Sequence, residues 1–368
     1  MKNSFGNYVQ VTIFGESHGP YIGAVLDGLT PGLKVDTDFI NHQLSLRRPS
    51  GVISTSRVEQ DQFQIVSGLF NGFTTGTPLC ILIPNSVQKS KDYSKTASLA
   101  RPGHADYTAQ VKYNGFQDYR GGGHFSGRIT AAIVAAAAVV LPALQQKGIR
   151  IGTHIQSCAG IQDIKFSATD TDSLLEQIKN LENSAFPVLD STAAEKIHKA
   201  IEEVAADGDS VGGVLETAVV GLPAGLGEPW FDTVEGLLSH ALFSIPAIKG
   251  VQYGSAFDMV DRRGSDFNDA FAMQDGKVVT LTNNNGGVNG GITNGMPVLF
   301  RCAVKPTPSI YKKQRTVDFN LGQDAELQIQ GRHDPAIIHR ARVVVDSMTA
   351  LVLFDMLVGR FGTAYFAS

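Results

Sequence analysis

Apolar residues recur along the chain in short alternating or continuous runs of the kind that form β-strands. In the run 8–14, Val9, Val11 and Ile13 are separated by polar side chains. Strands are predicted near 8–14, 22–27, 63–68, 79–83, 150–156, 214–221, 251–257 and 297–304.

Helix start and stop signals lie between several of these strands. They are a capping box at Thr192 and Glu195 with a stop at Gly208, a cap at Asp172 or Ser173 for 174–182, and an opening over 232–235 with a stop at Pro246. A long C-terminal helix is expected over 343–361. The alanine-rich run 129–144 predicts a buried helix and not a membrane span, since Arg128 begins it and Pro142 interrupts it.

Strands and helices intermix without regular β-α alternation, which favours a layered α+β fold over a doubly wound sheet. No linker divides the chain, so one domain over 1–368 is expected. Residues 15–33 align without gaps on 208–226, and seven of the 19 positions are identical. This internal similarity indicates two related halves, roughly 1–190 and 191–368. The alternative is a chance similarity between two glycine-rich turns.

Composition and charge narrow the class of protein. Hydrophobic residues make up 43% of the chain and charged residues 18%, which is typical of a globular protein. The net charge of −4 predicts no nucleic-acid or membrane partner, so an anionic ligand would need local arginines and histidines. The three cysteines lack a C-x-x-C spacing and the nine histidines lack an H-E-x-x-H spacing, so no metal site is expected. The N-terminus lacks a signal-peptide pattern, which predicts a cytoplasmic protein.

The segment 15–19 has the G-x-S-x-G pattern of a serine hydrolase nucleophile elbow. An elbow requires a helix directly after the serine, whereas the run 22–26 predicts a strand. The second copy of the pattern, at 208–212, has Val211 where the first has His18. We therefore expect Ser17 to shape the turn and His18 to carry chemistry, with the hydrolase as a rival hypothesis.

Further polar clusters predict an anion site. Gly121, Gly122 and Gly123 precede a predicted helix, where backbone N–H groups suit a phosphate, although they could equally be a turn that lets the helix pack. No G-x-G-x-x-G or GK[ST] pattern is present, so neither a Rossmann nor a P-loop site is expected. The other clusters are Arg47-Arg48-Pro49, 101–107, 283–291 with 305–309, and 331–335 with Arg340.

Together these segments resemble the chorismate synthase family, in the same order and over nearly the whole chain. The matching blocks are FGESHG (14–19), TTGTP (74–78), RPGHADYT (101–108), KY (112–113), DYRGGG (118–123), GDSVG (208–212), GLPAGLGEP (221–229), KGVQYG (249–254), GGVNGG (286–291), KPTPSI (305–310) and GRHDP (331–335). The resemblance implies a β-α-β sandwich with an internal pseudo-two-fold repeat, assembled as a homotetramer.

The activity that the resemblance implies is a trans 1,4-elimination in the shikimate pathway to aromatic amino acids. Phosphate and a ring hydrogen leave 5-enolpyruvylshikimate-3-phosphate, and chorismate forms. Reduced FMN is implied as cofactor without net redox change, because the departing hydrogen is not acidic and plain base catalysis is difficult. NADPH is implied as a candidate reductant.

The resemblance also implies roles for individual residues. His18 would protonate the leaving phosphate, His104 would protonate the reduced flavin, and Asp334 would assist proton removal. Substrate or NADP contacts would come from Arg47, Arg48, Arg101, Arg128, Arg332 and Arg340. FMN contacts would come from His124, Phe125, Ser126, Pro246, Ala247, Gly290, Lys305, Pro306, Thr307, Pro308, Ser309 and Arg332.

The chain also departs from the family pattern. The segment 124–129 reads HFSGRI where R-S-S-A-R-E is common, Pro246 stands where asparagine is frequent, and Val52 lies near a position where many members carry an arginine linked to NADPH. These departures bear on FMN affinity and NADPH use. They leave a flavin- or phosphate-binding protein without catalysis as a second rival.

Overall fold

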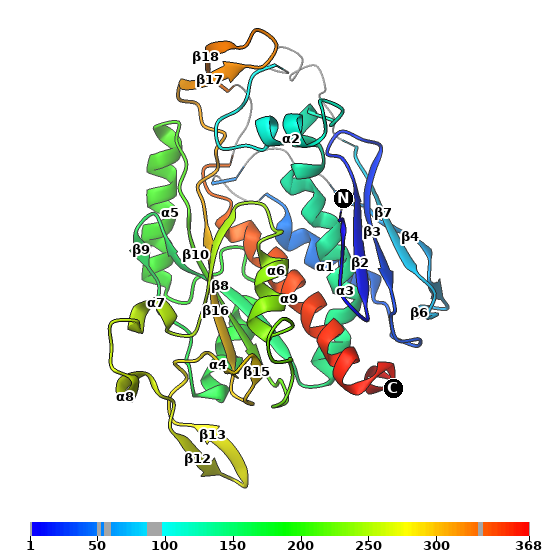
Figure 1. Ribbon diagram of the computed structural model, residues 1–368, viewed down its shortest axis with the longest axis vertical. Coiled ribbons are helices and arrows are strands. Elements are labelled where there is room, and N and C mark those ends of the chain that lie inside the picture. Colours follow the sequence, from blue (N-terminus) through cyan, green and yellow to red (C-terminus); the bar gives the residue numbers. More distant parts are fainter. Residues whose placement is uncertain (1, 50–52, 55–59, 87–97, 330–333, 368) are drawn as a thin grey trace.

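Two five-stranded antiparallel sheets enclose a layer of helices (Figure 1). The structure is a computed structural model and describes residues 2–49, 53–54, 60–86, 98–329 and 334–367. The first sheet has the order β1 (Ser4–Phe5), β2 (Gln10–Gly15), β3 (Tyr21–Asp27), β7 (Leu79–Pro84), β4 (Gln64–Ser67). The second has the order β11 (Ile248–Tyr253), β16 (Val298–Val304), β10 (Gly213–Val220), β8 (Arg150–Cys158), β9 (Ile161–Gln162).

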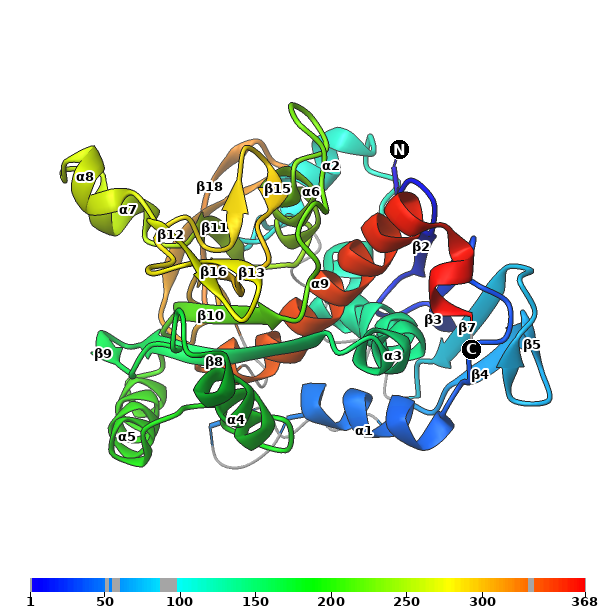
Figure 2. The same cartoon turned by 90° about the horizontal axis from the view of Figure 1, so that it is seen from below.

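Two buried helices fill the space between the sheets (Figure 2). Helix α3 (Thr130–Gln146) packs on β2, β3 and β7, while α9 (Ile338–Phe361) packs on β8 and β10, and the two helices pack on each other. Helices α1 (Thr37–Arg47) and α6 (Val234–Leu242) pack beside them. The stretch Gly127–Gln146 is long and apolar enough to cross a membrane, yet 89% of its most apolar window is buried inside the protein. The prediction of a buried helix here is confirmed.

Most of the predicted strands are present within a few residues of their expected ends. The strand expected over 251–257 ends earlier, because the chain turns at Gly254 (φ 51°) and enters the short helix α7 (Ala256–Met259). The C-terminal helix begins at Ile338, five residues before the expected start. Elements that the sequence pattern did not predict are α1 and the short hairpins β5 (Leu69–Phe70) with β6 (Phe73–Thr74), β12 (Phe271–Gln274) with β13 (Lys277–Thr280), β14 (Val288–Asn289) with β15 (Ile292–Thr293), and β17 (Gln314–Asp318) with β18 (Gln323–Leu327).

Two of the predicted helix caps are wrong. Helix α5 (Ser191–Ala206) is capped by Asp190, whose carboxylate accepts the N–H of Thr192, and α4 (Thr171–Leu181) is capped by Asp170. Both aspartates have the extended backbone that a cap requires. The sequence offers several capping residues in a row, and the extended one immediately before the first helical turn takes the role. The cap of α6 is Thr233, inside the expected opening.

The two sheets repeat one arrangement. The strand order β2-β3-β7-β4 in the first sheet corresponds to β8-β10-β16-β11 in the second. The sequence alignment of 15–33 with 208–226 pairs the residues of β3 with those of β10. Equivalent hydrogen bonds occur in the segment after β3 and in the segment after β10. The Thr74 hydroxyl donates to the Thr30 carbonyl (2.6 Å) and accepts from the Leu33 N–H (2.9 Å). Thr293 donates to Pro223 (2.7 Å) and accepts from Leu226 (2.9 Å). The predicted layered α+β fold with an internal repeat is confirmed.

The sheet to which each strand belongs bears on where the two halves divide. Strands β8 and β9 precede residue 190 but belong to the second sheet. We propose that the two related halves of this single domain divide between α3 and β8, near residue 148. The matched hydrogen bonds of Thr74 and Thr293 support a true repeat over a chance likeness.

Candidate active site

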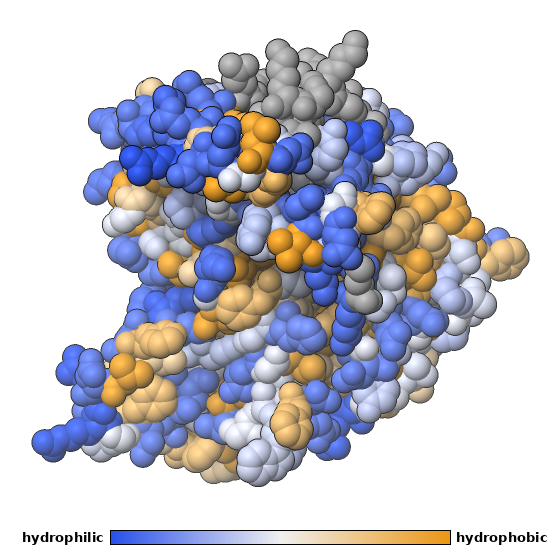
Figure 3. All heavy atoms as spheres, turned by 45° about the horizontal axis from the view of Figure 1, so that its top comes forward, coloured by the Kyte–Doolittle hydropathy of each residue, from blue (hydrophilic) through white to orange (hydrophobic). Residues whose placement is uncertain are grey.

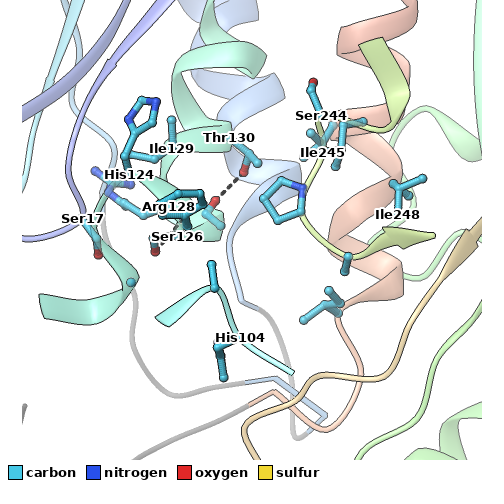
Figure 4. Close-up of a pocket in the computed structure, with 18 of the residues that line it drawn as sticks. Ser17, His104, His124, Ser126, Arg128, Ile129, Thr130, Ser244, Ile245 and Ile248 are labelled. Carbon is cyan, nitrogen blue, oxygen red and sulfur yellow. Dashed lines mark hydrogen bonds between the residues drawn. The ribbon is translucent and has the colours of Figure 1, made fainter. Parts of the chain in front are cut away.

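A cavity of about 990 Å³ lies where the N-terminal ends of α3 and α9 approach each other. Figure 4 shows Ser17 and Arg128 on one side of it and Ile245 and Ile248 on the other. Apolar side chains line part of the cavity, namely Ile129, Ile133, Ile245, Ile248, Val344 and Met348. The lining is also rich in cations, because segments from both halves bring their arginines and histidines to it.

Most of the predicted site residues line this cavity. Those residues are Arg47, Arg48, Arg101, His104, His124, Phe125, Ser126, Arg128, Pro246, Ala247, Lys305, Thr307, Pro308, Asp334 and Arg340. They come from segments nearly 300 positions apart in the sequence, so the fold alone brings them together.

The other predicted residues lie elsewhere. His18 and Ser309 are buried directly behind lining residues, next to Ser17 and His104. Pro306 is not among the lining residues, although both of its neighbours are. Gly290 forms the turn of the β14–β15 hairpin with a φ of 62° and does not line the cavity. Arg332 falls outside the described residues.

A cluster of charges includes three of the arginines that line the cavity. Asp61 is 3% exposed and binds Arg47 (3.1 Å) and Arg128, and Arg48 Nε lies 4.0 Å from it. Burial alone would raise the pKa of the Asp61 carboxyl, but Arg47 and Arg128 hold that pKa below its usual range. Three guanidiniums around one carboxylate leave net positive charge in a desolvated place, which suits an anionic ligand. Nothing local in the sequence marks Asp61.

Two more cavity arginines have carboxylate partners. Arg101 binds Asp106 through Nε and a terminal nitrogen, both at 2.7 Å. Burial would raise the pKa of the Asp106 carboxyl, but the bonds from Arg101 outweigh burial and lower that pKa. Arg340 binds Asp334 at 2.7 Å and donates to the Arg47 carbonyl at 2.8 Å. These pairs fix the planes of two guanidiniums that line the cavity.

The segment 305–309 closes another part of the wall. Lys305 Nζ donates to the Gly103 carbonyl (2.6 Å), and His104 Nε2 lies 2.7 Å from Ser309 Oγ. The Thr307 hydroxyl is buried and has no hydrogen-bond partner among the described residues. An unsatisfied buried hydroxyl in a wall of this cavity suits a polar ligand group.

The turn at 15–19 does not have the geometry of a nucleophile elbow. Ser17 and His18 are 2% and 3% exposed, and strand β3, not a helix, follows at Tyr21. The Ser17 N–H donates to the Gly123 carbonyl (3.0 Å), which ties the turn to the loop before α3. The serine hydrolase hypothesis therefore lacks the required strand-turn-helix arrangement.

The glycines at 121–123 do not lead directly into a helix, as the sequence had predicted. Short 3₁₀ turns over 120–125 and 127–129 intervene, and α3 begins only at Thr130. The Gly122 N–H is used within the loop, since it donates to the Tyr119 carbonyl (3.3 Å). Within the described segment 118–146, the glycines are therefore not followed directly by a helix whose N-terminus could hold a phosphate.

His339, at the start of α9, is a residue that the sequence patterns did not single out. Its burial should make the stability of the protein depend on pH. It is 3% exposed, its Nε2 lies 2.9 Å from Ser54 Oγ, and burial lowers its pKa to about 4. The unfolded chain binds this proton below about pH 6.5 and the folded chain does not, so acidification through this range destabilises the protein. From pH 7 to 5 His339 should cost about 2 kcal/mol of unfolding free energy.

Urea unfolding at pH 7 and pH 5 measures this cost. His339→Gln should lose less stability over the interval than the parent protein, by about 2 kcal/mol. His42→Gln, on the exposed face of α1, is the control and should behave as the parent does. Equal losses in His339→Gln and the parent would contradict the prediction.

Comparisons with known proteins agree on one family. A family model described as chorismate synthase matches residues 9–358. A chorismate synthase of Pyrococcus abyssi is 45% identical over 355 residues, which cover 96% of this chain and 97% of the relative. One of Dehalococcoides mccartyi is 44% identical over 357 residues, 97% of this chain and 96% of the relative. A solved structure, "Crystal Structure of Chorismate Synthase", superposes with a TM-score of 0.77 at 31% identity and covers 97% of this chain and 94% of its own.

Proposed function

Because this chain belongs to the chorismate synthase family, we propose that the cavity between α3 and α9 is where its reaction takes place. The activity is that of a carbon–oxygen lyase acting on a phosphorylated substrate, in the shikimate pathway to aromatic amino acids. The observation that carries the proposal is the convergence of Arg47, Arg101, Arg128 and Arg340 on one cavity.

The arginines that line the cavity suit the substrate. 5-Enolpyruvylshikimate-3-phosphate has two carboxylates and one phosphate, and each needs charged hydrogen-bond donors when it is removed from water. We propose that Arg47, Arg48 and Arg128 hold one anionic group around Asp61, and that Arg101 and Arg340 hold the others. Asp61, Asp106 and Asp334 keep these guanidiniums in place.

Other lining residues suit FMN. The apolar lining side chains offer a surface for a planar aromatic ring, Lys305 offers a cation, and the unpartnered Thr307 hydroxyl offers a donor or acceptor. His124, Phe125 and Ser126 of the altered segment all line the cavity, which supports the proposal. When bound, reduced FMN supplies the transient electron donation that weakens the bond between carbon and the phosphate oxygen.

We assign the proton chemistry to three residues. His18 holds a proton for the leaving phosphate, since an imidazole titrates near neutrality. His104 holds a proton at the flavin side of the cavity and is oriented by Ser309. Asp334 accepts a proton late in the reaction, and its bond to Arg340 keeps its carboxylate at the cavity surface.

An anaerobic assay tests the function. With photoreduced FMN and 5-enolpyruvylshikimate-3-phosphate, we expect phosphate and chorismate to form in equal amounts. The flavin should be regenerated at each turnover, because the elimination has no net redox change. Oxidised FMN should support no turnover. Stoichiometric oxidation of FMN, or full turnover with oxidised FMN, would contradict the proposal.

Assembly and location are further parts of the proposal. We propose a cytoplasmic homotetramer, with NADPH as a candidate source of electrons for FMN. Exposed apolar side chains support assembly: Trp230 and Phe231 are 86% and 93% exposed, and Phe271 and Met273 protrude on the β12–β13 hairpin. Apolar side chains also reach the face drawn in Figure 3. Contiguous exposed apolar surface commonly marks contacts between subunits.

A further inference from the structure

The loop 118–123 lies directly against the turn that carries His18. The Ser17 N–H donates to the Gly123 carbonyl at 3.0 Å, so the backbones of the two segments are joined beside the imidazole. Both segments line the cavity: the turn contributes Ser17, and the loop contributes Gly121 and Gly122. The conformation of this loop therefore affects the place of the His18 ring.

Gly121 is the residue of this loop that approaches the imidazole. Its backbone is left-handed (φ 59°, ψ 20°). A Cβ on this backbone would lie under 3.0 Å from Cε1 and Nδ1 of His18, and 3.0 Å from Ser17 Oγ. Real Cβ atoms do not approach other atoms so closely, so the ring occupies space that any side chain at 121 would need.

The neighbouring glycines have different surroundings. At Gly122, which is also left-handed (φ 84°), a Cβ would meet only Ser126 Cβ at 3.8 Å and an Arg101 nitrogen at 3.9 Å. At Gly123 a Cβ would collide with the carbonyl of Asp118. Of the three glycines, Gly121 alone has His18 as the group that a side chain would displace.

Asp118 holds the same loop in shape. Its carboxylate accepts two hydrogen bonds from the Arg120 guanidinium, both 2.8 Å, and one from the Arg120 N–H at 3.1 Å. The bond from Arg120 is the main cause that lowers the pKa of Asp118, and the charge of His18 lowers it further. The Asp118 carboxylate is thus close enough to His18 to interact with its charge.

We propose that Gly121 is a positioning residue for His18: its lack of a side chain leaves the space that sets the imidazole beside the cavity, on a loop shaped by the Asp118–Arg120 pair. The inference deepens the proposed function, since it rests on His18 as the proton donor. It gives the first glycine of the triad a role that differs from phosphate binding.

Gly121→Ala and Gly122→Ala form a matched pair, because each adds one methyl group to a left-handed backbone. Gly121→Ala should lower kcat about 10²-fold, the usual cost of misplacing a catalytic group by about 1 Å. Its KM and FMN affinity should change little, because the arginines and the 305–309 segment are untouched. Crystal structures should show the His18 ring displaced in Gly121→Ala and in its original place in Gly122→Ala.

A double-mutant cycle separates the inference from the function on which it rests. In the His18→Ala background the methyl group of Gly121→Ala fills space that the ring has left. The loss of unfolding free energy caused by Gly121→Ala should therefore be less than half its value beside His18, and kcat should fall no further. If His18→Ala alone leaves kcat intact, the proton-donor role fails, while the stability cycle still tests the contact. An undisplaced ring in Gly121→Ala, or equal stability losses in both backgrounds, would overturn the inference.

Discussion

His18→Ala should lower kcat by about 10²–10⁴-fold, the usual contribution of a general acid. Phosphate is a poor leaving group when it departs fully ionised, and His18 is the histidine of the FGESHG turn, buried beside the cavity. Because the substrate is held by the arginines, KM should change much less than kcat. Steady-state rates with saturating reduced FMN measure the effect.

Ser17→Ala is the matched control in the same turn. The bond that joins Ser17 to the loop before α3 comes from its backbone N–H, which alanine keeps. We therefore expect a loss in kcat of less than about tenfold, as for one neutral hydrogen bond. Organophosphonates should not inactivate the parent enzyme. An inactive Ser17→Ala enzyme beside an active His18→Ala enzyme would reverse the assignment.

Arg128→Ala should have a large effect on two quantities, catalytic efficiency and stability. The guanidinium binds the buried Asp61 and donates to Asn85 Oδ1 at 3.0 Å. Its loss should lower kcat/KM by about 10- to 150-fold, equivalent to about 1.5–3 kcal/mol for a charged hydrogen bond to the substrate. It should also lower the unfolding free energy by about 3 kcal/mol, the lower end for a broken buried pair, because Arg47 still binds Asp61.

Arg101→Ala separates the two effects. Arg101 and Asp106 keep 16% and 19% of their side-chain surface accessible, whereas Asp61 keeps none, so breaking this pair should cost less stability than Arg128→Ala does. The loss of kcat/KM should resemble that of Arg128→Ala.

Arg128→Lys keeps a charge near Asp61 but lacks the planar guanidinium fork. It should therefore recover stability more than it recovers kcat/KM. A folded Arg128→Ala protein with normal kcat/KM would show that Arg128 has only a structural role.

The sequence by itself determined the elements and their repetition. Strands such as 79–83 and the apolar helix over 129–144 were predictable because periodicity and composition are properties of a few consecutive residues. The similarity between 15–33 and 208–226 indicated the internal repeat, because the same backbone turns require the same glycines. The motif blocks indicated the family for a similar reason: each is a local arrangement of chemical groups.

Contacts between distant segments were decided only by the tertiary structure. Asp61 between Arg47 and Arg128, the use of Asp190 in place of Thr192 as a cap, and the approach of Gly121 to His18 have no signature in the residues around them. Their energies depend on burial and on distances of a few ångströms between groups remote in the chain, which spacing along the sequence does not encode. The residue types were readable from the sequence, whereas their partners depended on how the two halves pack around α3 and α9.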